Sequence, residues 1–215
     1  MLNRFARALF TRIFTPVARL LLRLGVSPDV VTLVGTFGVC AGALIWFPRG
    51  HLFTGTMVVT AFVFSDTVDG IMARMQGRSS SWGAYLDSTL DRFGDAAVFG
   101  GLILYYSNDH GDLGHDWNQV GEVLALTCLI LGSIVSYARA RAEGLGMQAN
   151  VGIAERADRL VSTLVCAGFV GTQWIPDQTL LVVLALLAVA SVVTVVQRIL
   201  MVRRQALAAV PDPTA

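Results

Sequence analysis

Four acidic side chains lie within two otherwise apolar segments of this sequence, and they are the residues best suited to chemistry: Asp66, Asp69, Asp87 and Asp91. Burying an ionised carboxylate among apolar side chains costs several kcal/mol. The first two are three residues apart and the last two are four apart, so each pair shares one face of a helix. If two helices direct these pairs toward one point, divalent cations bound between them offset the repulsion. The spacing therefore predicts a metal site made of carboxylate oxygens.

The composition indicates that these carboxylates belong to a membrane protein. Hydrophobic residues make up 54% of the chain and charged residues 14%, whereas soluble domains carry about 25% charged residues. The mean hydropathy is +0.63. We therefore predict an all-α fold that crosses the membrane several times. The cysteines lie in apolar runs, at spacings that fit neither a zinc site nor a disulfide framework.

Helical periodicity divides the chain into an amphipathic start, a membrane domain and a tail. In residues 1–25, apolar side chains recur at helical spacing between arginines, which predicts a helix lying in the membrane interface. Residues 26–204 are expected to form a six-helix transmembrane domain, and residues 205–215 a C-terminal tail without regular structure. The predicted spans are residues 29–47, 53–75, 80–106, 119–141, 157–175 and 178–203.

Arginine placement predicts the orientation of these helices. The ends on the N-terminal side carry most of the arginines, whereas the opposite side carries only Arg49. Because basic residues concentrate on the cytoplasmic side, both termini are expected in the cytoplasm. Arg74 and Arg78 lie where the two aspartate-bearing segments meet. The metal site is therefore expected to open to the cytoplasm from the cytoplasmic membrane.

The aspartates belong to a longer pattern, D-x2-D-G-x2-A-R-x8-G-x3-D-x3-D, which begins at Asp66 and ends at Asp91. Within it, Gly70 and Gly83 leave room for a ligand or a neighbouring helix, and Arg74 is suited to holding a phosphate. The pattern resembles, without a departure, the signature of the CDP-alcohol phosphatidyltransferases. The fold of that family, six helices with an N-terminal interfacial helix, would cover nearly the whole chain.

The resemblance implies how such a site works. The four aspartates would ligate two divalent cations, Mg²⁺ or Mn²⁺. Asp91 would also act as general base on the hydroxyl that attacks CDP-diacylglycerol, and CMP would leave. Asp95, one turn beyond Asp91, is not assigned to the metal. The resemblance further implies a homodimer, and contacts between the CDP group and Asp29, Val30, Val31, Thr32, Gly70, Arg74 and Ser80.

A second set of basic residues indicates the acceptor. It lies at the cytoplasmic ends of the last three predicted spans, and Arg198 stands within an apolar run, where a lone cation is costly. An anionic substrate would offset that charge, so the cluster favours a phosphorylated acceptor. Arginines at such helix ends also anchor membrane proteins, and Arg198 can extend toward the interface, so this alternative stays open.

The stretches SYARARAE and GIAERADRL and the late VQR resemble the actinobacterial phosphatidylinositol phosphate synthases within the same family. This resemblance implies transfer of the phosphatidyl group from CDP-diacylglycerol to inositol 1-phosphate. It also implies an acceptor pocket made of Ser136, Arg139, Arg141, Arg156 and Arg198.

Two other functions remain open from the sequence. A phosphatidylglycerophosphate synthase, with glycerol 3-phosphate as acceptor, needs the same kind of anionic-acceptor pocket. An ion or metal transporter can also use intramembrane aspartates, but a conduction path needs polar residues across its full depth, and the first, second and sixth spans lack them. The expected partners are the lipid bilayer and the two substrates, with no nucleic acid.

Overall fold

The computed structural model describes residues 2–77, 80–111 and 113–208, with the side chains of residues 2–11 excepted. The predicted all-α fold is confirmed throughout these ranges. Eight α-helices and one short 3-10 helix follow one another along the chain: α1 (Leu2–Arg23), α2 (Pro28–Trp46), η1 (Phe47–Arg49), α3 (Leu52–Val63), α4 (Ser65–Met75), α5 (Ser81–Ser107), α6 (His115–Gly144), α7 (Arg156–Gly171) and α8 (Gln178–Ala208).

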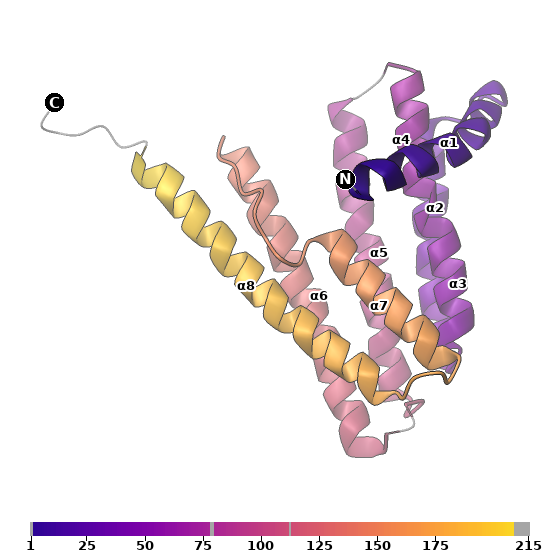
Figure 1. Cartoon of the computed structure of the whole chain (residues 1–215), viewed down its shortest axis with the longest axis vertical. Helices are drawn as coiled ribbons and strands as arrows, with labels where there is room; N and C mark the ends of the chain where they lie inside the picture. Colours follow the sequence, from indigo (N-terminus) through magenta and orange to yellow (C-terminus); the bar gives the residue numbers. More distant parts are fainter. Residues whose placement is uncertain (1, 78–79, 112, 209–215) are drawn as a thin grey trace, which may run out of the picture.

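The long helices form a bundle that opens at one end (Figure 1). Helix α5 packs between α2 and α6, α3 packs against both α2 and α7, and α8 packs against α6 and α7. Toward the end of the bundle where α4 lies, α8 diverges from the other helices, while α1 runs crosswise beside α4 (Figure 1). The open end therefore has two sides, one formed by α4 and α5 and the other by α6 and α8.

Within the described residues, four stretches are long and apolar enough to cross a membrane: Pro28–Arg49, Leu52–Met75, His115–Gly144 and Gln178–Ala208. In the part of the chain that the structure describes, α5 and α7 do not reach this standard. The first half of α5 carries charged residues, and α7 has only 16 residues. The prediction of several membrane helices is confirmed, but the count of six is not.

The predicted span 53–75 is divided in two at Phe64, where α3 ends and α4 begins. Glycines of α2 lie against this break: a Cβ added to Gly35 would lie 1.7 Å from Ser65 Oγ, and one added to Gly38 would lie 2.2 Å from Phe62 Cγ. The Ser65 hydroxyl donates to the Phe62 carbonyl at 2.6 Å, across the break. Close packing on α2 thus sets the direction in which α4 carries its aspartates.

The start of α2 is capped by Ser27 and Pro28. Ser27 accepts a hydrogen bond from Val30 N at 3.3 Å, and Pro28 occupies the first turn. Gly25, with φ +78°, makes the turn that separates α1 from α2. The far end of the chain differs from the prediction, because α8 continues through residues 205–208. There Gln205 Oε1 accepts a hydrogen bond from Gln148 N at 2.9 Å. Residues 209–215, residue 1 and Arg78 lie outside the described residues.

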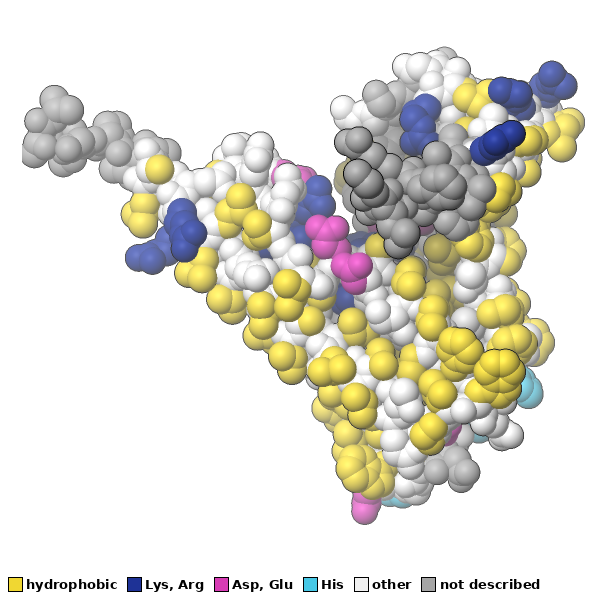
Figure 2. Space-filling model, in the orientation of Figure 1, with side chains coloured by type: hydrophobic (Ala, Val, Ile, Leu, Met, Phe, Trp, Pro, Cys, Tyr) yellow, Lys and Arg dark blue, Asp and Glu magenta, His cyan; other side chains and the backbone are white. Residues whose placement is uncertain are grey.

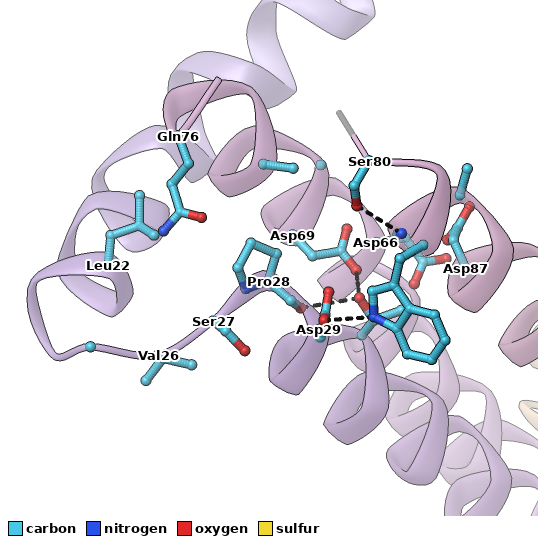
Figure 3. Close-up of a pocket in the computed structure, with 17 residues that line it drawn as sticks. Leu22, Val26, Ser27, Pro28, Asp29, Asp66, Asp69, Gln76, Ser80 and Asp87 are labelled. Atoms are coloured by element: carbon cyan, nitrogen blue, oxygen red, sulfur yellow. Dashed lines mark hydrogen bonds between the residues drawn. The ribbon is translucent and has the colours of Figure 1, made fainter. Parts of the chain in front are cut away.

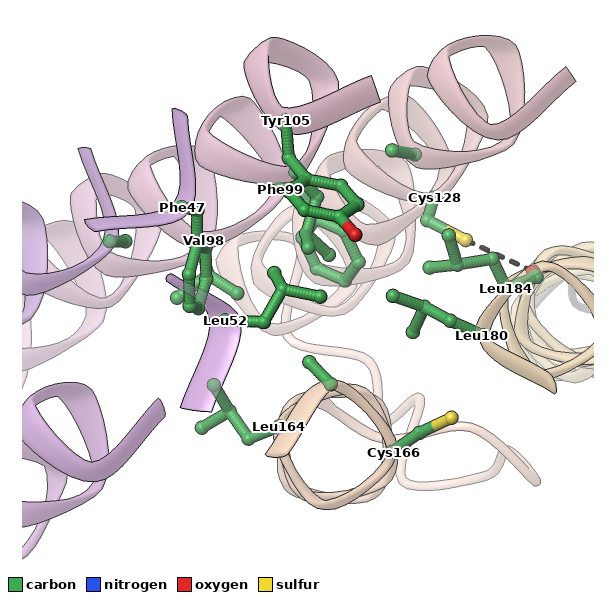
Figure 4. Packing of buried hydrophobic residues seen from close by; sticks show 14 of the residues in the cluster. Phe47, Leu52, Val98, Phe99, Tyr105, Cys128, Leu164, Cys166, Leu180 and Leu184 are labelled. Atoms are coloured by element: carbon green, nitrogen blue, oxygen red, sulfur yellow. Dashed lines mark hydrogen bonds between the residues drawn. The ribbon is translucent and has the colours of Figure 1, made fainter. Parts of the chain in front are cut away.

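The main hydrophobic core lies away from the aspartates, where α2, α3, α5, α6, α7 and α8 meet (Figure 4). Phe47, Leu52, Phe99 and Leu184 are buried there, and the Cys128 thiol donates to the Leu184 carbonyl at 3.2 Å. Among the described residues, Cys40, Cys128 and Cys166 are free cysteines. A smaller cluster joins Ala18 of α1 to apolar residues of α4. This second cluster fixes the back of α4, so that its polar face points into the bundle.

Candidate active site

A cavity of about 920 Å³ lies where the start of α2 faces α4 and the start of α5 (Figure 3). Its walls bring together side chains that are far apart in the sequence. The residues of the predicted site that line it are Asp29, Thr32, Asp66, Asp69, Gly70, Ser80 and Asp87. Three of the four motif aspartates therefore face one cavity, together with four of the residues expected to contact the CDP group.

Asp69 is held in place by α2. Thr32 Oγ1 donates to Asp69 Oδ2 at 2.6 Å, and both side chains are buried. Nearby, Asp29 Oδ2 accepts a hydrogen bond from Trp82 Nε1 at 3.0 Å, which joins α2 to α5. The two residues between them face elsewhere, since Val30 is exposed and Val31 packs against the cluster under α1. The segment from Asp29 to Thr32 thus contributes its two polar side chains, Asp29 and Thr32, to the cavity wall.

Ser80 caps α5. Its hydroxyl accepts a hydrogen bond from Gly83 N at 3.0 Å, and both residues line the cavity. Across the cavity, Gly70 lies beside Arg74, because a Cβ built at Gly70 would be in ordinary contact with Arg74 Nη1 at 3.6 Å. Arg74 itself is exposed. Arg74, the residue predicted to hold a phosphate, therefore lies next to the cavity wall. Its exposed guanidinium can reach an anion bound there.

Asp91 lies deeper and faces a cation from α7. Arg156 Nη1 lies 2.8 Å from Asp91 Oδ1 and 3.9 Å from Asp66 Oδ2. The guanidinium thus bridges the two motif helices. Among the described residues, no three acidic, histidine or cysteine side chains lie close enough to hold one metal ion. The predicted meeting of all four carboxylates is therefore not seen, which is expected of ionised groups that repel one another without a cation.

The donor set nevertheless fits a divalent cation. Carboxylate oxygens are the ligands that Mg²⁺ and Mn²⁺ prefer. Asp66 and Asp91 already share one positive charge, the Arg156 guanidinium. Asp66 also lines the same cavity as Asp69 and Asp87. Carboxylates from both α4 and α5 thus line the space that a cation would occupy.

The predicted acceptor residues do not form one cluster with free side chains. Arg198 is 3% exposed. Its Nε donates to the Val151 carbonyl at 2.9 Å, and its Nη1 donates to the Val135 carbonyl. Two main-chain oxygens thus accept hydrogen bonds from this buried cation. Ser136 bonds within its own helix and Arg139 pairs with Glu143 at 2.9 Å, while Arg141 is exposed. Arg156 is the member of this group that reaches the motif aspartates.

Sequence reasoning missed a buried ion-pair network next to Asp91. Asp95 is 8% exposed and Arg159 is 1% exposed, and they lie 3.8 Å apart. The position of Asp95, one turn beyond Asp91, was the available signal. Arg159 is near the start of α7, a position that also suits an anchor at a helix end, but its side chain is buried in the bundle. Figure 2 shows acidic and basic side chains gathered in the hollow between α8 and the rest of the molecule.

Comparison with known proteins places this arrangement in a family. The curated relatives include a phosphatidylinositol phosphate synthase of Streptomyces avermitilis, which is 53% identical over 95% of this chain and 84% of that protein. A second, from Mycobacterium tuberculosis, is 45% identical over 90% of this chain and 87% of its own length.

Solved structures of a phosphatidylinositol phosphate synthase are also similar to this chain. The crystal structure of the M. tuberculosis phosphatidylinositol phosphate synthase with CDP-DAG bound has a TM-score of 0.81 and 44% identity, and the match covers 89% of this chain and 94% of that one. The structure of the same enzyme with manganese and citrate has a TM-score of 0.80 and 44% identity, over 88% of each chain. Residues 25–153 match the family described as CDP-alcohol phosphatidyltransferase. With its complete aspartate motif on α4 and α5, the chain belongs to the CDP-alcohol phosphatidyltransferase family.

Proposed function

We propose that this chain transfers the phosphatidyl group of CDP-diacylglycerol to inositol 1-phosphate, giving phosphatidylinositol phosphate and CMP. The observation that carries the proposal is the placement of the family's motif: Asp66 and Asp69 of α4 and Asp87 of α5 line one cavity, which the start of α2 completes. The relatives at 45–53% identity are phosphatidylinositol phosphate synthases, which favours inositol phosphate over glycerol 3-phosphate as acceptor. The transporter alternative does not account for the full motif.

In this proposal each group at the site has a defined task. Asp66, Asp69, Asp87 and Asp91 hold the metal, two ions of Mg²⁺ or Mn²⁺. When bound, the cations neutralise the pyrophosphate and the charge that develops on the leaving CMP. A homologous enzyme binds manganese in its crystal structure, which supports this assignment.

Asp91 takes the proton of the attacking hydroxyl. The hydroxyl oxygen then forms a bond to the β-phosphorus, and the bond from that phosphorus to the CMP oxygen breaks. Arg74, Gly70 and the segment Asp29–Thr32 hold the CDP group at the mouth of the cavity. The position of Asp91 supports its role. Among the described residues predicted to bind the acceptor, Arg156 is the one that reaches the motif. Its Nη1 lies 2.8 Å from Asp91 Oδ1.

We propose that the acceptor phosphate enters between α5 and the α6–α8 side, where Arg156 lies. The contributing residues are Ser136, Arg139, Arg141, Arg156 and Arg198. Arginine is the residue suited to planar, charged recognition of a phosphate. The hollow in Figure 2, with its basic and acidic side chains, supports this route.

The membrane arrangement is also part of the proposal. We propose six spans, α1 in the interface, both termini and the active site on the cytoplasmic side of the cytoplasmic membrane, and a homodimer. Four stretches have the length and apolarity to span. The crosswise course of α1 beside the bundle and the apolar face seen in Figure 2 support this arrangement.

Release of CMP by the purified protein in lipid tests the proposal. The assay contains CDP-diacylglycerol and Mg²⁺, and compares inositol 1-phosphate, inositol, glycerol 3-phosphate and serine as acceptors. Release driven by inositol 1-phosphate alone supports it. If glycerol 3-phosphate is preferred, the reaction class stands and the proposed acceptor is wrong. If no acceptor drives CMP release, with Mn²⁺ as well as with Mg²⁺, the assignment of the aspartates to a metal site is contradicted.

A further inference from the structure

Asp95 is a buried carboxylate that lies outside the metal motif, and arginines approach it from two helices. Arg156 Nε donates to Asp95 Oδ1 at 3.0 Å, from α7. Arg159 Nη2 lies 3.8 Å from Asp95 Oδ2, and Arg92 Nη2, on α5 itself, lies 3.5 Å from the same oxygen. An acid this deeply buried is stable as an anion only where such partners neutralise it. The three arginines around one carboxylate make Asp95 the centre of the charge network beside the motif.

Arg159 has contacts that make it part of the framework. Its Nη1 donates to the Ala154 carbonyl at 3.1 Å and its Nη2 to the Gly132 carbonyl at 3.4 Å, which joins α7 to α6. Gly132 provides the space, since a Cβ there would lie 3.1 Å from the Arg159 guanidinium. Asp95 is the acidic partner of this buried cation. Through Arg159, then, the carboxylate of Asp95 is fixed relative to both helices.

Arg156 has a different environment, because one edge of its guanidinium is held and the other faces the motif. The Nε edge is on Asp95 at 3.0 Å, while Nη1 is 2.8 Å from Asp91 Oδ1. Gly94 lies beside the group, since a Cβ built there would be in ordinary contact with Arg156 Nη2 at 3.7 Å. A planar guanidinium bound at Nε can rotate little, so the bond to Asp95 determines where the Nη atoms point.

We propose that Asp95 is a positioning residue for the transfer reaction: it holds Arg156 by its Nε edge, so that the Nη edge meets the phosphate of the acceptor next to Asp91. The proposal rests on the proposed function, in which Arg156 binds the acceptor and Asp91 removes its proton. A preformed guanidinium loses less freedom on binding a phosphate than a mobile one does. The contribution of Asp95 should therefore appear in the binding of the acceptor.

The first test is Asp95→Asn, which keeps the shape of the side chain and removes its charge. The KM for inositol 1-phosphate should rise about tenfold, as for loss of a charged hydrogen bond. The KM for CDP-diacylglycerol and the Mn²⁺ affinity, measured by the electron paramagnetic resonance of free Mn²⁺, should stay within about twofold of wild type. Asp95→Glu should restore part of the acceptor KM. Asp116→Asn, an exposed aspartate in the first turn of α6, is the matched control. An unchanged acceptor KM, or an equal loss in all three quantities, would overturn the proposal.

A double-mutant cycle separates positioning from general damage. Arg156→Gln, Asp95→Asn and the double variant are compared by the acceptor KM in the same assay. If Asp95 acts through Arg156, the double variant should match Arg156→Gln alone, whereas multiplied effects would contradict the proposal. Should Asp95→Asn fail to fold, Arg156→Lys keeps the charge without the Nε contact and should raise the acceptor KM to a similar extent. A wild-type acceptor KM in Arg156→Lys would then exclude positioning.

Failure of the proposed function gives a different result. If the wild-type chain uses glycerol 3-phosphate in place of inositol 1-phosphate, the acceptor assignment is wrong. The same cycle run with glycerol 3-phosphate still decides whether Asp95 acts through Arg156, because both acceptors carry a phosphate.

Discussion

The hydroxyl of Thr32 donates to the carboxylate of Asp69 at 2.6 Å, and this bond joins the first turns of α2 to the motif helix α4. The same hydroxyl also lies 3.1 Å from the Pro28 carbonyl. Because both ends are buried, the bond fixes one carboxylate of the motif in the wall of the cavity. The start of α2 is therefore part of the active site as well as a boundary of the bundle.

Replacing Thr32 by valine should weaken the reaction without unfolding the protein. The side chain keeps its shape but loses the donor to Asp69, so kcat/KM for CDP-diacylglycerol should fall by about fivefold to tenfold. CMP release in lipid at varied CDP-diacylglycerol measures this. Thr127→Val is the matched control, because the Thr127 hydroxyl donates to the Val123 carbonyl of its own helix at 2.7 Å. Equal effects of the two variants would count against a role for Thr32 at the site.

Asp91→Asn should stop turnover and leave binding of CDP-diacylglycerol largely intact. The amide cannot accept the proton of the attacking hydroxyl, and loss of a general base costs about 10²–10⁴-fold in rate. CMP release gives the rate, and the shift of the melting temperature by CDP-diacylglycerol gives the binding. A variant that keeps normal turnover would remove Asp91 as the base. One that neither turns over nor binds would assign it a role in metal binding alone.

Removal of divalent cations should abolish CMP release. The carboxylates of the motif cannot hold a pyrophosphate without positive charge between them. Treatment with a chelator, followed by addition of Mg²⁺ or Mn²⁺, should stop the reaction and then restore it. The same chelator saturated with Mg²⁺ beforehand is the control and should have no effect. Full activity after thorough chelation would contradict the metal assignment.

Arg198→Ala should impair both the acceptor site and stability. The guanidinium donates to the Val135 and Val151 carbonyls, so its removal loses two hydrogen bonds from a charged donor, at a cost of about 1–3 kcal/mol. The melting temperature in detergent should fall, and the acceptor KM should rise more than the KM for CDP-diacylglycerol. Arg203→Ala, an exposed arginine on the same helix, is the control and should resemble wild type. If Arg198→Ala is less stable but keeps the wild-type acceptor KM, Arg198 has a structural role and does not bind the acceptor.

The features that the sequence predicted well are local. The spacing of the aspartates on two helices depends only on helical geometry, and the structure places Asp66, Asp69 and Asp87 on one cavity. The start of α2 is also determined locally, by the capping chemistry of Ser27 and Pro28. In these cases the determining contacts lie within one or two turns of the chain, so the pattern of residues is sufficient.

The features that the sequence did not predict depend on contacts between distant segments. The break at Phe64 occurs where Gly35 and Gly38 of α2 allow close approach, and nothing within residues 53–75 shows this. Arg198 was expected to need an anion, but its partners are main-chain carbonyls, which side-chain patterns do not reveal. The pairing of Asp95 with Arg156 and Arg159 likewise requires α5 and α7 to pack first.

Two adjacent glycines of α5 test whether packing against α2 maintains the site. A Cβ added to Gly101 would lie 2.8 Å from the Ala43 carbonyl oxygen, whereas one added to Gly100 would meet nothing within 4 Å. Gly101→Ala should therefore push α5 from α2 and destabilise the protein by about 1–3 kcal/mol. Gly100→Ala should leave stability unchanged or raise it by up to about 1 kcal/mol, because alanine favours a helix over glycine. The melting temperature in detergent gives both values, and CMP release shows whether the displaced helix still presents Asp87 and Asp91. Equal melting temperatures for the two variants would mean that α2 and α5 can separate slightly with no loss of stability. Other packing contacts would then position the motif.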